Sequence, residues 1–299
     1  MNKAVILSCL LFSITCSMVY SQNNQRIIAP GANVGKVADG FSFTEGPAVD
    51  KDGNVYFTDQ PNDRIWKWTP DGKVSVFLEN MGRANGMYFD KNGNLLSCSD
   101  MENEIWSISP DGKHTIILTD YEGKKLNGPN DLWIHPNGSI YFTDPLYKRD
   151  YWTRNPDMQQ DGQHLYYMSP DRKTIIRVDN ELEQPNGIIG SPDGKRLYVA
   201  DIRAGKTYVY NIASDGSLED KKLFTPMGSD GMTMDENGNI YLTGKGVTVF
   251  NPQGEKIEHI PIDAGWTANV CFGGKDMKTL FITASQAVYT LQMNVKGIR

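Results

Sequence analysis

Short stretches in which apolar and polar residues alternate recur along most of this chain, and they are rich in Val, Ile, Tyr and Phe. Alternation over roughly four to eight residues is typical of half-buried β-strands, whereas no stretch shows the period of a helix. Asp-Gly and Asn-Gly dipeptides separate several of the stretches, as at Asp52-Gly53 and Asn92-Gly93. Because glycine tolerates positive φ, such dipeptides between apolar runs indicate β-hairpins. The pattern therefore predicts an all-β fold.

A single polar side chain opens each of six successive repeats and is followed at once by a strand-like segment. The six opening residues are Glu45, Asn85, Asn130, Asn186, Asp230 and Asn269. They lie 40, 45, 56, 44 and 39 residues apart, a spacing typical of repeat architectures. Each repeat contains four strand-like segments, so we predict a six-bladed β-propeller with four antiparallel strands per blade. Residues 26–43 are expected to supply the outer strand of the last blade and so to close the ring.

The opening residues are the candidate chemistry of the chain. In a closed ring of blades, equivalent residues of the innermost strands meet near one axis. Two carboxylates with a formal charge of −2 and four amides would then converge, and such hard oxygen donors suit a divalent cation such as calcium. The expected ligands are Glu45, Asn130, Asn186 and Asp230. The alternative is that these residues are plain turn residues around a water-filled channel in a non-catalytic binding propeller.

Composition and the N-terminal segment set the expected location. The chain has 299 residues and a formal net charge of −6, which argues against a nucleic-acid partner because such proteins present a basic surface. Residues 1–21 begin with Lys3 and continue into a short apolar run, the pattern of a signal peptide cleaved before Gln22 and too short to span a membrane. We therefore expect a single propeller domain over residues 22–299, periplasmic or secreted, acting as a monomer or weak dimer.

Export would remove two of the four cysteines and leave Cys98 and Cys271. Both lie inside apolar, strand-like segments, so we interpret them as buried thiols rather than as a disulfide bridge. Neither the cysteines nor the four histidines have the spacing of a zinc site.

A second set of acidic residues follows the second strand of several repeats. Asp59, Asp100 and Asp201 occupy this place in repeats one, two and four, and their recurrence favours a structural turn role. Asp144 occupies it in repeat three, where a long insertion at residues 145–162 follows, so a contact with substrate is equally open. The insertion could form a lid, and its aromatic and basic residues could either face a cyclic ligand or pack on the rim. These residues are Tyr147, Tyr151, Trp152 and Arg154.

Six segments of the chain resemble the senescence-marker-protein/gluconolactonase/luciferin-regenerating-enzyme-like family. The resemblance depends on the order and spacing of residues 43–47, 126–132, 141–145, 184–188, 229–232 and 269–274. It implies a six-bladed propeller with one calcium, zinc or manganese ion in the channel. It also implies ligands at Glu45, Asn186 and Asp230, with Asn130 as a fourth ligand or a substrate contact. Lactones are the commonest substrates that it implies. Animal members that act on sugar lactones have Arg where this chain has Gly128, so their sugar-acid specificity is not transferred.

The expected function is a metal-dependent lactonase, a carboxylic ester hydrolase in which a metal-activated water attacks the carbonyl of a sugar-like lactone. Asp230 is expected to act as general base, with Asp131 or Asp144 in reserve, and Glu45 is the second catalytic carboxylate. The expected substrate contacts are Asn85, Asn130, Asp131, Asp144 and Asn269. Hydrolysis of phosphotriesters at the same ion and non-catalytic ligand binding are the two alternatives, because the fold alone does not decide among them.

Overall fold

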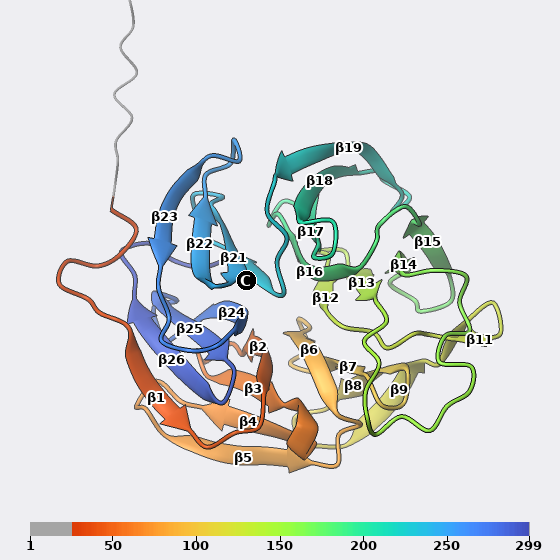
Figure 1. Ribbon diagram of the computed structural model, residues 1–299, viewed down its shortest axis with the longest axis horizontal. Coiled ribbons are helices and arrows are strands. Elements are labelled where there is room, and N and C mark those ends of the chain that lie inside the picture. The colour runs from red at the N-terminus through yellow and green to blue at the C-terminus, as the bar shows by residue number, and fades with distance from the viewer. Residues whose placement is uncertain (1–25, 299) are drawn as a thin grey trace, which may run out of the picture.

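A computed structural model describes residues 26–298 as a ring of six antiparallel sheets, each with four strands (Figure 1). Each sheet is one blade, and its first strand lies nearest to the axis of the ring. The one helical element within these residues is a short 3-10 turn, η1 (Gln60–Asn62). The predicted six-bladed propeller is thus confirmed. The predicted signal peptide at residues 1–21 and its cleavage before Gln22 lie outside the described residues.

The first three blades follow the chain in simple order, each as four neighbouring strands. Blade one consists of β2 (Thr44–Val49), β3 (Val55–Asp59), β4 (Arg64–Trp68) and β5 (Val74–Glu79). Blade two consists of β6 (Ala84–Phe89), β7 (Leu95–Ser99), β8 (Glu104–Ile108) and β9 (His114–Leu118). A two-stranded hairpin then follows, formed by β10 (Asp120–Tyr121) and β11 (Lys124–Lys125). Blade three consists of β12 (Leu132–Ile134), β13 (Ile140–Asp144), β14 (His164–Met168) and β15 (Ile175–Asp179).

The last three blades continue the ring and close it. Blade four consists of β16 (Pro185–Gly190), β17 (Arg196–Asp201), β18 (Lys206–Ile212) and β19 (Leu218–Thr225). Blade five consists of β20 (Met232–Met234), β21 (Ile240–Gly244), β22 (Gly246–Phe250) and β23 (Lys256–Ile260). Blade six consists of β24 (Thr267–Gly273), β25 (Thr279–Ala284), β26 (Ala287–Gln292) and β1 (Gly35–Asp39).

The two ends of the described chain complete blade six and approach the axis. Strand β1 pairs with β26, so the N-terminal stretch supplies the outer strand as predicted. Near the other end, the amide of Ile298 donates to the carbonyl of Met234 on the innermost strand of blade five. The C-terminal residues accordingly lie close to the centre of the ring (Figure 1).

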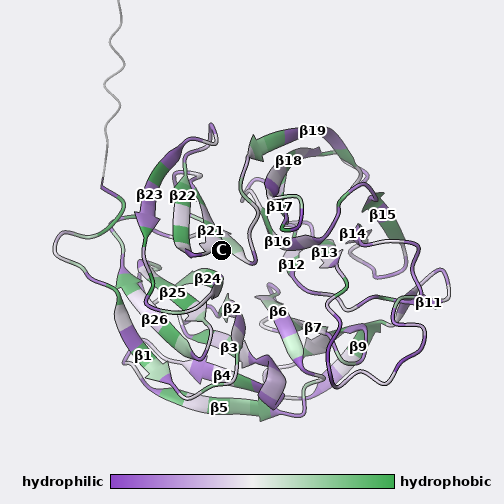
Figure 2. Cartoon of the chain, viewed as in Figure 1, coloured by the Kyte–Doolittle hydropathy of each residue, from purple (hydrophilic) through white to green (hydrophobic). Residues whose placement is uncertain are grey.

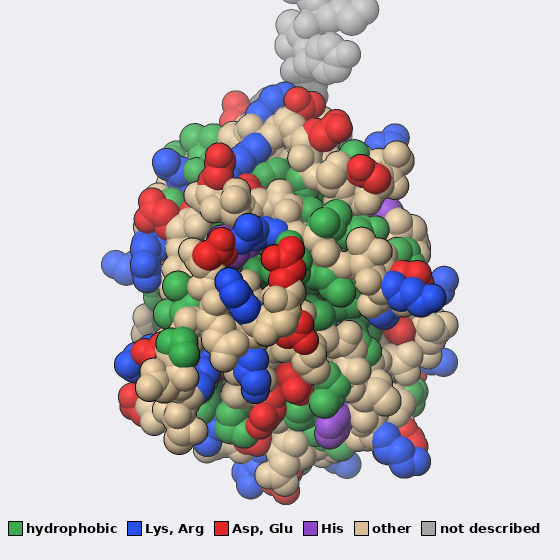
Figure 3. Space-filling view, turned by 90° about the vertical axis from the view of Figure 1, so that its right-hand side faces the viewer, with side chains coloured by type: hydrophobic (Ala, Val, Ile, Leu, Met, Phe, Trp, Pro, Cys, Tyr) green, Lys and Arg blue, Asp and Glu red, His purple; other side chains and the backbone are tan. Residues whose placement is uncertain are grey.

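Five hydrophobic clusters pack between neighbouring blades and hold the ring together. The rings of Phe57 in blade one and Phe281 in blade six, for example, lie 5.5 Å apart between centroids. Hydrophobic residues lie mainly in the strands, whereas hydrophilic residues lie in the loops and also on outer strands such as β23 (Figure 2). On the face shown in Figure 3, acidic and basic side chains are interspersed. Apolar burial between the blades therefore supplies the main stabilising term.

Cys98 and Cys271 are buried and unbridged, which confirms their interpretation as core residues. Within residues 26–298, no helix is long and apolar enough to cross a membrane.

Candidate active site

The opening residue of each repeat lies where the innermost strand departs from regular pairing. In blades one, two, four and six, the register between the first two strands shifts at or beside the opening. In blades three and five, the innermost strand begins only after it, at Leu132 and Met232. Such irregularities re-aim side chains out of the ladder. The backbone therefore frees the opening side chains for contacts across the ring.

The glycine that follows several openings is required by the close approach of neighbouring innermost strands. A Cβ at Gly46 would lie 1.9 Å from the carbonyl oxygen of Asn85, and one at Gly86 would lie 2.6 Å from that of Asn130. The amide of Gly86 also donates to the Asn130 carbonyl over 2.7 Å. Gly46 and Gly86 lie inside strands, so the alternative that these dipeptides are simple turns is wrong for blades one and two.

Threonines on the second strands of blades one and three tie the next opening along the chain to the preceding blade. The Thr143 hydroxyl donates to the carbonyl of Asn186 over 2.8 Å, and the Thr58 hydroxyl contacts that of Asn85 at 3.3 Å. Both threonines are fully buried. They were not predicted as part of the site, although a Thr recurs near the end of the second strand in four repeats. These bonds fix the backbone from which the site residues project.

Asp230 is held by two hydrogen bonds from different blades. Asn186 Nδ2 donates to Asp230 Oδ1 over 2.8 Å, and Trp266 Nε1 donates to Asp230 Oδ2 over 2.6 Å. Asn186 Nδ2 also lies 2.7 Å from the hydroxyl of Tyr147 in the insertion. Trp266 was missed by sequence reasoning because it stands in a loop before the last opening and has no counterpart in the other repeats. The carboxylate of Asp230 is thus fixed in orientation.

Three carboxylates of the site influence one another. Burial raises the pKa of Glu45 well above its ordinary value, and the nearby charge of Asp230 raises it further. Burial likewise raises the pKa of Asp230 to about 6, although the bonds from Trp266 and Asn186 oppose the shift. Burial raises the pKa of Asp131 to about 7. Blades one, three and five therefore direct negative charge toward one region, where a cation would relieve the repulsion.

The remaining opening residues are also gathered near the axis. Asn85, Asn130 and Asn269 are buried, with at most 6% of each residue exposed. Asn269 of blade six also reaches Asp131 of blade three across the ring, since its side chain lowers the pKa that burial raises there. Asp131 in turn accepts the amide of Leu132 over 2.9 Å. The structure thus brings the side chains of four openings together with Asp131, and it buries Asn85 and Asn130 on the adjoining inner strands.

The donor set at the axis fits a hard divalent cation. The amide nitrogen of Asn186 is committed to Asp230 and Tyr147, so its carbonyl oxygen is the atom left for a cation. Glu45 adds a buried carboxylate, and Asn130 can add an amide oxygen. Within residues 26–298, no three His, Cys, Asp or Glu side chains are arranged as a metal site. A cation held here would therefore depend on amide oxygens and water as well as on carboxylates.

Asp144 has a structural position. It is fully buried, and its two oxygens accept the amides of Asn127 and Gly128 over 2.8 and 2.9 Å. Asp59 and Asp201 accept two backbone amides in the same way. All three carboxylates anchor the chain that leads into an innermost strand. These bonds give Asp144 a structural role, and its predicted contact with substrate stays a prediction.

The predicted correspondence of Asp100 with Asp59 is wrong by one residue. Ser99 is the last residue of β7, as Asp59 is the last residue of β3, and its hydroxyl donates to the carbonyl of Gly82. Asp100 lies one residue further on, in a turn, and points toward the insertion, where its carboxylate accepts the hydroxyl of Tyr151 over 2.6 Å. The shift arose because a sequence pattern does not locate the end of a strand to one residue.

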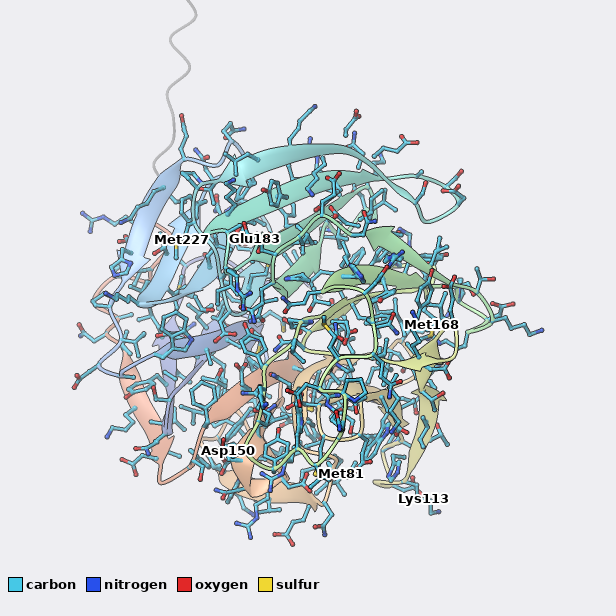
Figure 4. All side chains as sticks on the ribbon, turned by 45° about the vertical axis from the view of Figure 1, so that its right-hand side comes forward. Met81, Lys113, Asp150, Met168, Glu183 and Met227 are labelled. Atoms are coloured by element: carbon cyan, nitrogen blue, oxygen red, sulfur yellow. The ribbon has the colours of Figure 1, made fainter. Side chains whose placement is uncertain are left out.

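We call residues 145–162 the strap. Figure 4 labels Asp150 within it, on the loop that crosses in front of the blades. The rings of Tyr147, Tyr151 and Trp152 are half-buried. The guanidinium carbon of Arg83 lies 4.2 Å from the centre of the Tyr151 ring, and that of Arg154 lies 3.3 Å from the centre of the Trp152 ring. The strap therefore packs on the rim and reaches the site through Tyr147. A separate cavity of about 1020 Å³ lies between blades one and six and includes none of the opening residues.

Comparison with known proteins places the chain in a family. The family model described as SMP-30/Gluconolactonase/LRE-like region matches residues 43–286. The gluconolactonase of Zymomonas mobilis is 29% identical, over 93% of this chain and 86% of its own. A solved gluconolactonase from Xanthomonas campestris is 28% identical with a TM-score of 0.80, over 89% of this chain and 91% of its own. Regucalcin from Agrobacterium tumefaciens, at 18% identity and a TM-score of 0.73 over 91% of this chain and 96% of its own, shows the fold alone. This chain belongs to the SMP-30/gluconolactonase/LRE-like family.

Proposed function

We propose that this protein is a metal-dependent lactonase that hydrolyses a sugar-like lactone. The observation that supports the proposal most is the mutual influence of Glu45, which is buried, and Asp230, which is partly buried and accepts the amide of Asn186. The named activity of the relative from Zymomonas mobilis, which is similar over 93% of this chain, supports the same reaction class. Two carboxylates this close, one of them buried, repel each other without a counter-charge, so a purely structural role for the pair is disfavoured.

The proposed cofactor is one divalent cation, with calcium as first choice and zinc or manganese as alternatives. The chain would hold it with Glu45, Asn130, Asn186 and Asp230. Bound there, the cation would polarise the ester carbonyl and stabilise the charge that develops on its oxygen.

The reaction adds one water across the ring ester. The water oxygen bonds to the carbonyl carbon, the bond from that carbon to the ring oxygen breaks, and the ring oxygen receives a proton. Asp230 is proposed to accept the proton of the attacking water, and its bonds to Asn186 and Trp266 hold the carboxylate in place for this step. Asp131, whose pKa burial raises to about 7, is the second candidate for holding that proton. Asn85 and Asn269 are left to bind substrate hydroxyls.

A lactone panel with and without chelator tests the proposal. We expect hydrolysis that chelator abolishes and added calcium, zinc or manganese restores. Glu45→Gln and Asp230→Asn should each lower kcat/KM by roughly a hundredfold or more. Glu219→Gln, an exposed position on blade four, is the matched control. Hydrolysis of an organophosphate triester alone would favour the phosphotriesterase alternative. Failure on every ester would favour a binding propeller. Full activity in both site variants would contradict the assignment of residues.

A further inference from the structure

Arg149 brings the positive charge of the strap to the candidate active site. Its guanidinium carbon lies 5.2 Å from the centre of the Tyr147 ring, and the Tyr147 hydroxyl lies 2.7 Å from Asn186 Nδ2. The same Asn186 Nδ2 donates to Asp230 Oδ1 over 2.8 Å, so Tyr147 connects Arg149 to the carboxylate of Asp230. The strap therefore places a guanidinium beside the axis.

One edge of this guanidinium is fixed and the other is open. Arg149 Nε donates to Asp100 Oδ2 over 3.1 Å. Its two terminal nitrogens have no hydrogen-bond partner among residues 26–298, and 27% of the side chain is exposed. A pair of terminal guanidinium nitrogens matches the two oxygens of a carboxylate or phosphate and binds them through parallel hydrogen bonds. Arg149 is thus preorganised to bind an oxyanion.

Asp100 is the positioning residue for Arg149. Its Oδ2 also accepts the hydroxyl of Tyr151 over 2.6 Å and the amide of Gln60 over 3.1 Å, so blade one and the strap hold it together. A Cβ at Gly128 would lie 2.5 Å from Asp100 Oδ1, so glycine at this position makes room for the carboxylate. Burial raises the pKa of Asp100, and the charge of Arg149 is the largest influence that opposes the shift.

Two other arginines that contact the strap or belong to it, Arg83 and Arg154, bind aromatic rings and backbone carbonyls. Arg83 lies over the Tyr151 ring and donates to the backbone carbonyl of Pro61. Arg154 lies over the Trp152 ring and donates to backbone carbonyls of the segment before blade three. Arg149 is therefore the one of these three with open donors beside the carboxylate pair.

We propose that Arg149 is a specificity-determining residue that binds an anionic substituent of the substrate, outside the lactone ring. The inference rests on the proposed lactonase function and names a substrate class: lactones that carry a carboxylate, phosphate or sulfonate. An anionic substituent gains a charge-assisted, two-pronged contact, whereas a neutral lactone leaves the open nitrogens to water. A contact of this kind corresponds to roughly a ten- to hundredfold preference.

The test compares kcat/KM on phosphogluconolactone with kcat/KM on gluconolactone, using the metal-loaded full protein. The ratio of the two values is the readout, because a general loss of activity cancels in it. We expect Arg149→Gln to lower the ratio by roughly tenfold or more and Arg149→Lys to keep part of it. Asp100→Asn should lower the ratio less, since the guanidinium of Arg149 remains but is no longer held in a fixed orientation by Asp100. Arg64→Gln, which removes an exposed arginine on blade one, is the control.

An unchanged ratio in Arg149→Gln would overturn the inference, because equal loss on both lactones means that Arg149 only holds the strap. If wild type hydrolyses neither lactone, the proposed function fails instead. Calorimetry with glucarate and gluconate then decides on Arg149, since binding of these acids needs no turnover. We expect the dianion glucarate to bind more tightly than gluconate and Arg149→Gln to erase the difference. Equal binding of both acids to wild type would also overturn the inference.

Discussion

The amide of Asn186 donates to the carboxylate of Asp230 over 2.8 Å, although the two residues stand 44 positions apart and open neighbouring blades. Trp266, at the entry to blade six, occupies the second carboxylate oxygen over 2.6 Å. Residues from three consecutive blades thus meet at one carboxylate: Asp230 supplies it, and Asn186 and Trp266 hold it in a fixed orientation. The site is built by the closure of the ring and not by any single loop, so its chemistry can be tested by changing single contacts between blades.

Trp266→Phe should weaken binding of the proposed cation by roughly tenfold, because it removes the bond that orients Asp230. Isothermal calorimetry with calcium measures the affinity. Trp106→Phe is the matched control, since Trp106 also donates over 2.6 Å to a carboxylate, that of Glu104 on the third strand of blade two. Equal affinity in wild type and Trp266→Phe would show that this bond does not support the cation.

Gly46→Ala should cost at least about 3 kcal/mol of unfolding free energy, since its Cβ would lie 1.9 Å from the Asn85 carbonyl oxygen. Gly93→Ala is the control, because Gly93 also has positive φ but nothing lies within 4 Å of its Cβ position. That change should cost about 1–2 kcal/mol, the ordinary penalty of the left-handed region. Urea unfolding gives both values. Similar losses for the two variants would refute the close approach of the innermost strands.

Asp144 should make stability depend on pH. Burial raises its folded-state pKa to about 7, above the ordinary value of 3.8, so the folded state binds the proton more tightly. The stabilisation that the protonated Asp144 gives the folded state is complete below the pKa of the unfolded chain. It is lost as pH rises through the pKa of the folded state. The stability of Asp144→Asn relative to wild type should therefore improve by about 1–2 kcal/mol between about pH 5 and pH 7.

Urea unfolding of both proteins in chelator measures this difference at each pH. Asp193→Asn is the control, because Asp193 is exposed and its pKa is lowered by the Ser191 hydroxyl. A difference between Asp144→Asn and wild type that stays constant with pH would mean that Asp144 is already ionised across this range.

The mature protein is predicted to begin at Gln22. Expression of the full chain in a bacterial host, followed by intact-mass measurement of the periplasmic and secreted fractions, gives the N-terminus. Leu10→Arg interrupts the apolar run and should keep the protein in the cytoplasm with residues 1–21 attached. Recovery of the uncleaved wild-type chain from the cytoplasm would refute export.

The regular part of the molecule was predictable because each blade must satisfy the same packing rules. The spacing of the openings fixed the number of blades, and the stretch before Glu45 supplied the closing strand, here Gly35–Asp39. Burial and closure act on every repeat alike, so the same pattern of apolar and polar residues recurs along the chain. The same recurrence identified the opening residues of the innermost strands.

The irregular part of the site left no such trace. Trp266 and Arg149 have no counterparts in the other repeats, and each acts on a carboxylate that is distant in sequence. The structural role of Asp144 could not be predicted either. An Asp that accepts two backbone amides looks the same in a sequence as an Asp that contacts substrate. Such contacts depend on how neighbouring blades and the strap are packed, and packing is not periodic.

An anomalous difference map from crystals grown with Mn²⁺ tests the cation site most directly. The account predicts one strong peak within roughly 2.0–2.6 Å of oxygens from Glu45, Asn130, Asn186 and Asp230. The peak should disappear in Glu45→Gln crystals prepared in the same way. A peak elsewhere in the ring, or ordered water alone among these side chains at saturating Mn²⁺, would contradict the proposed centre.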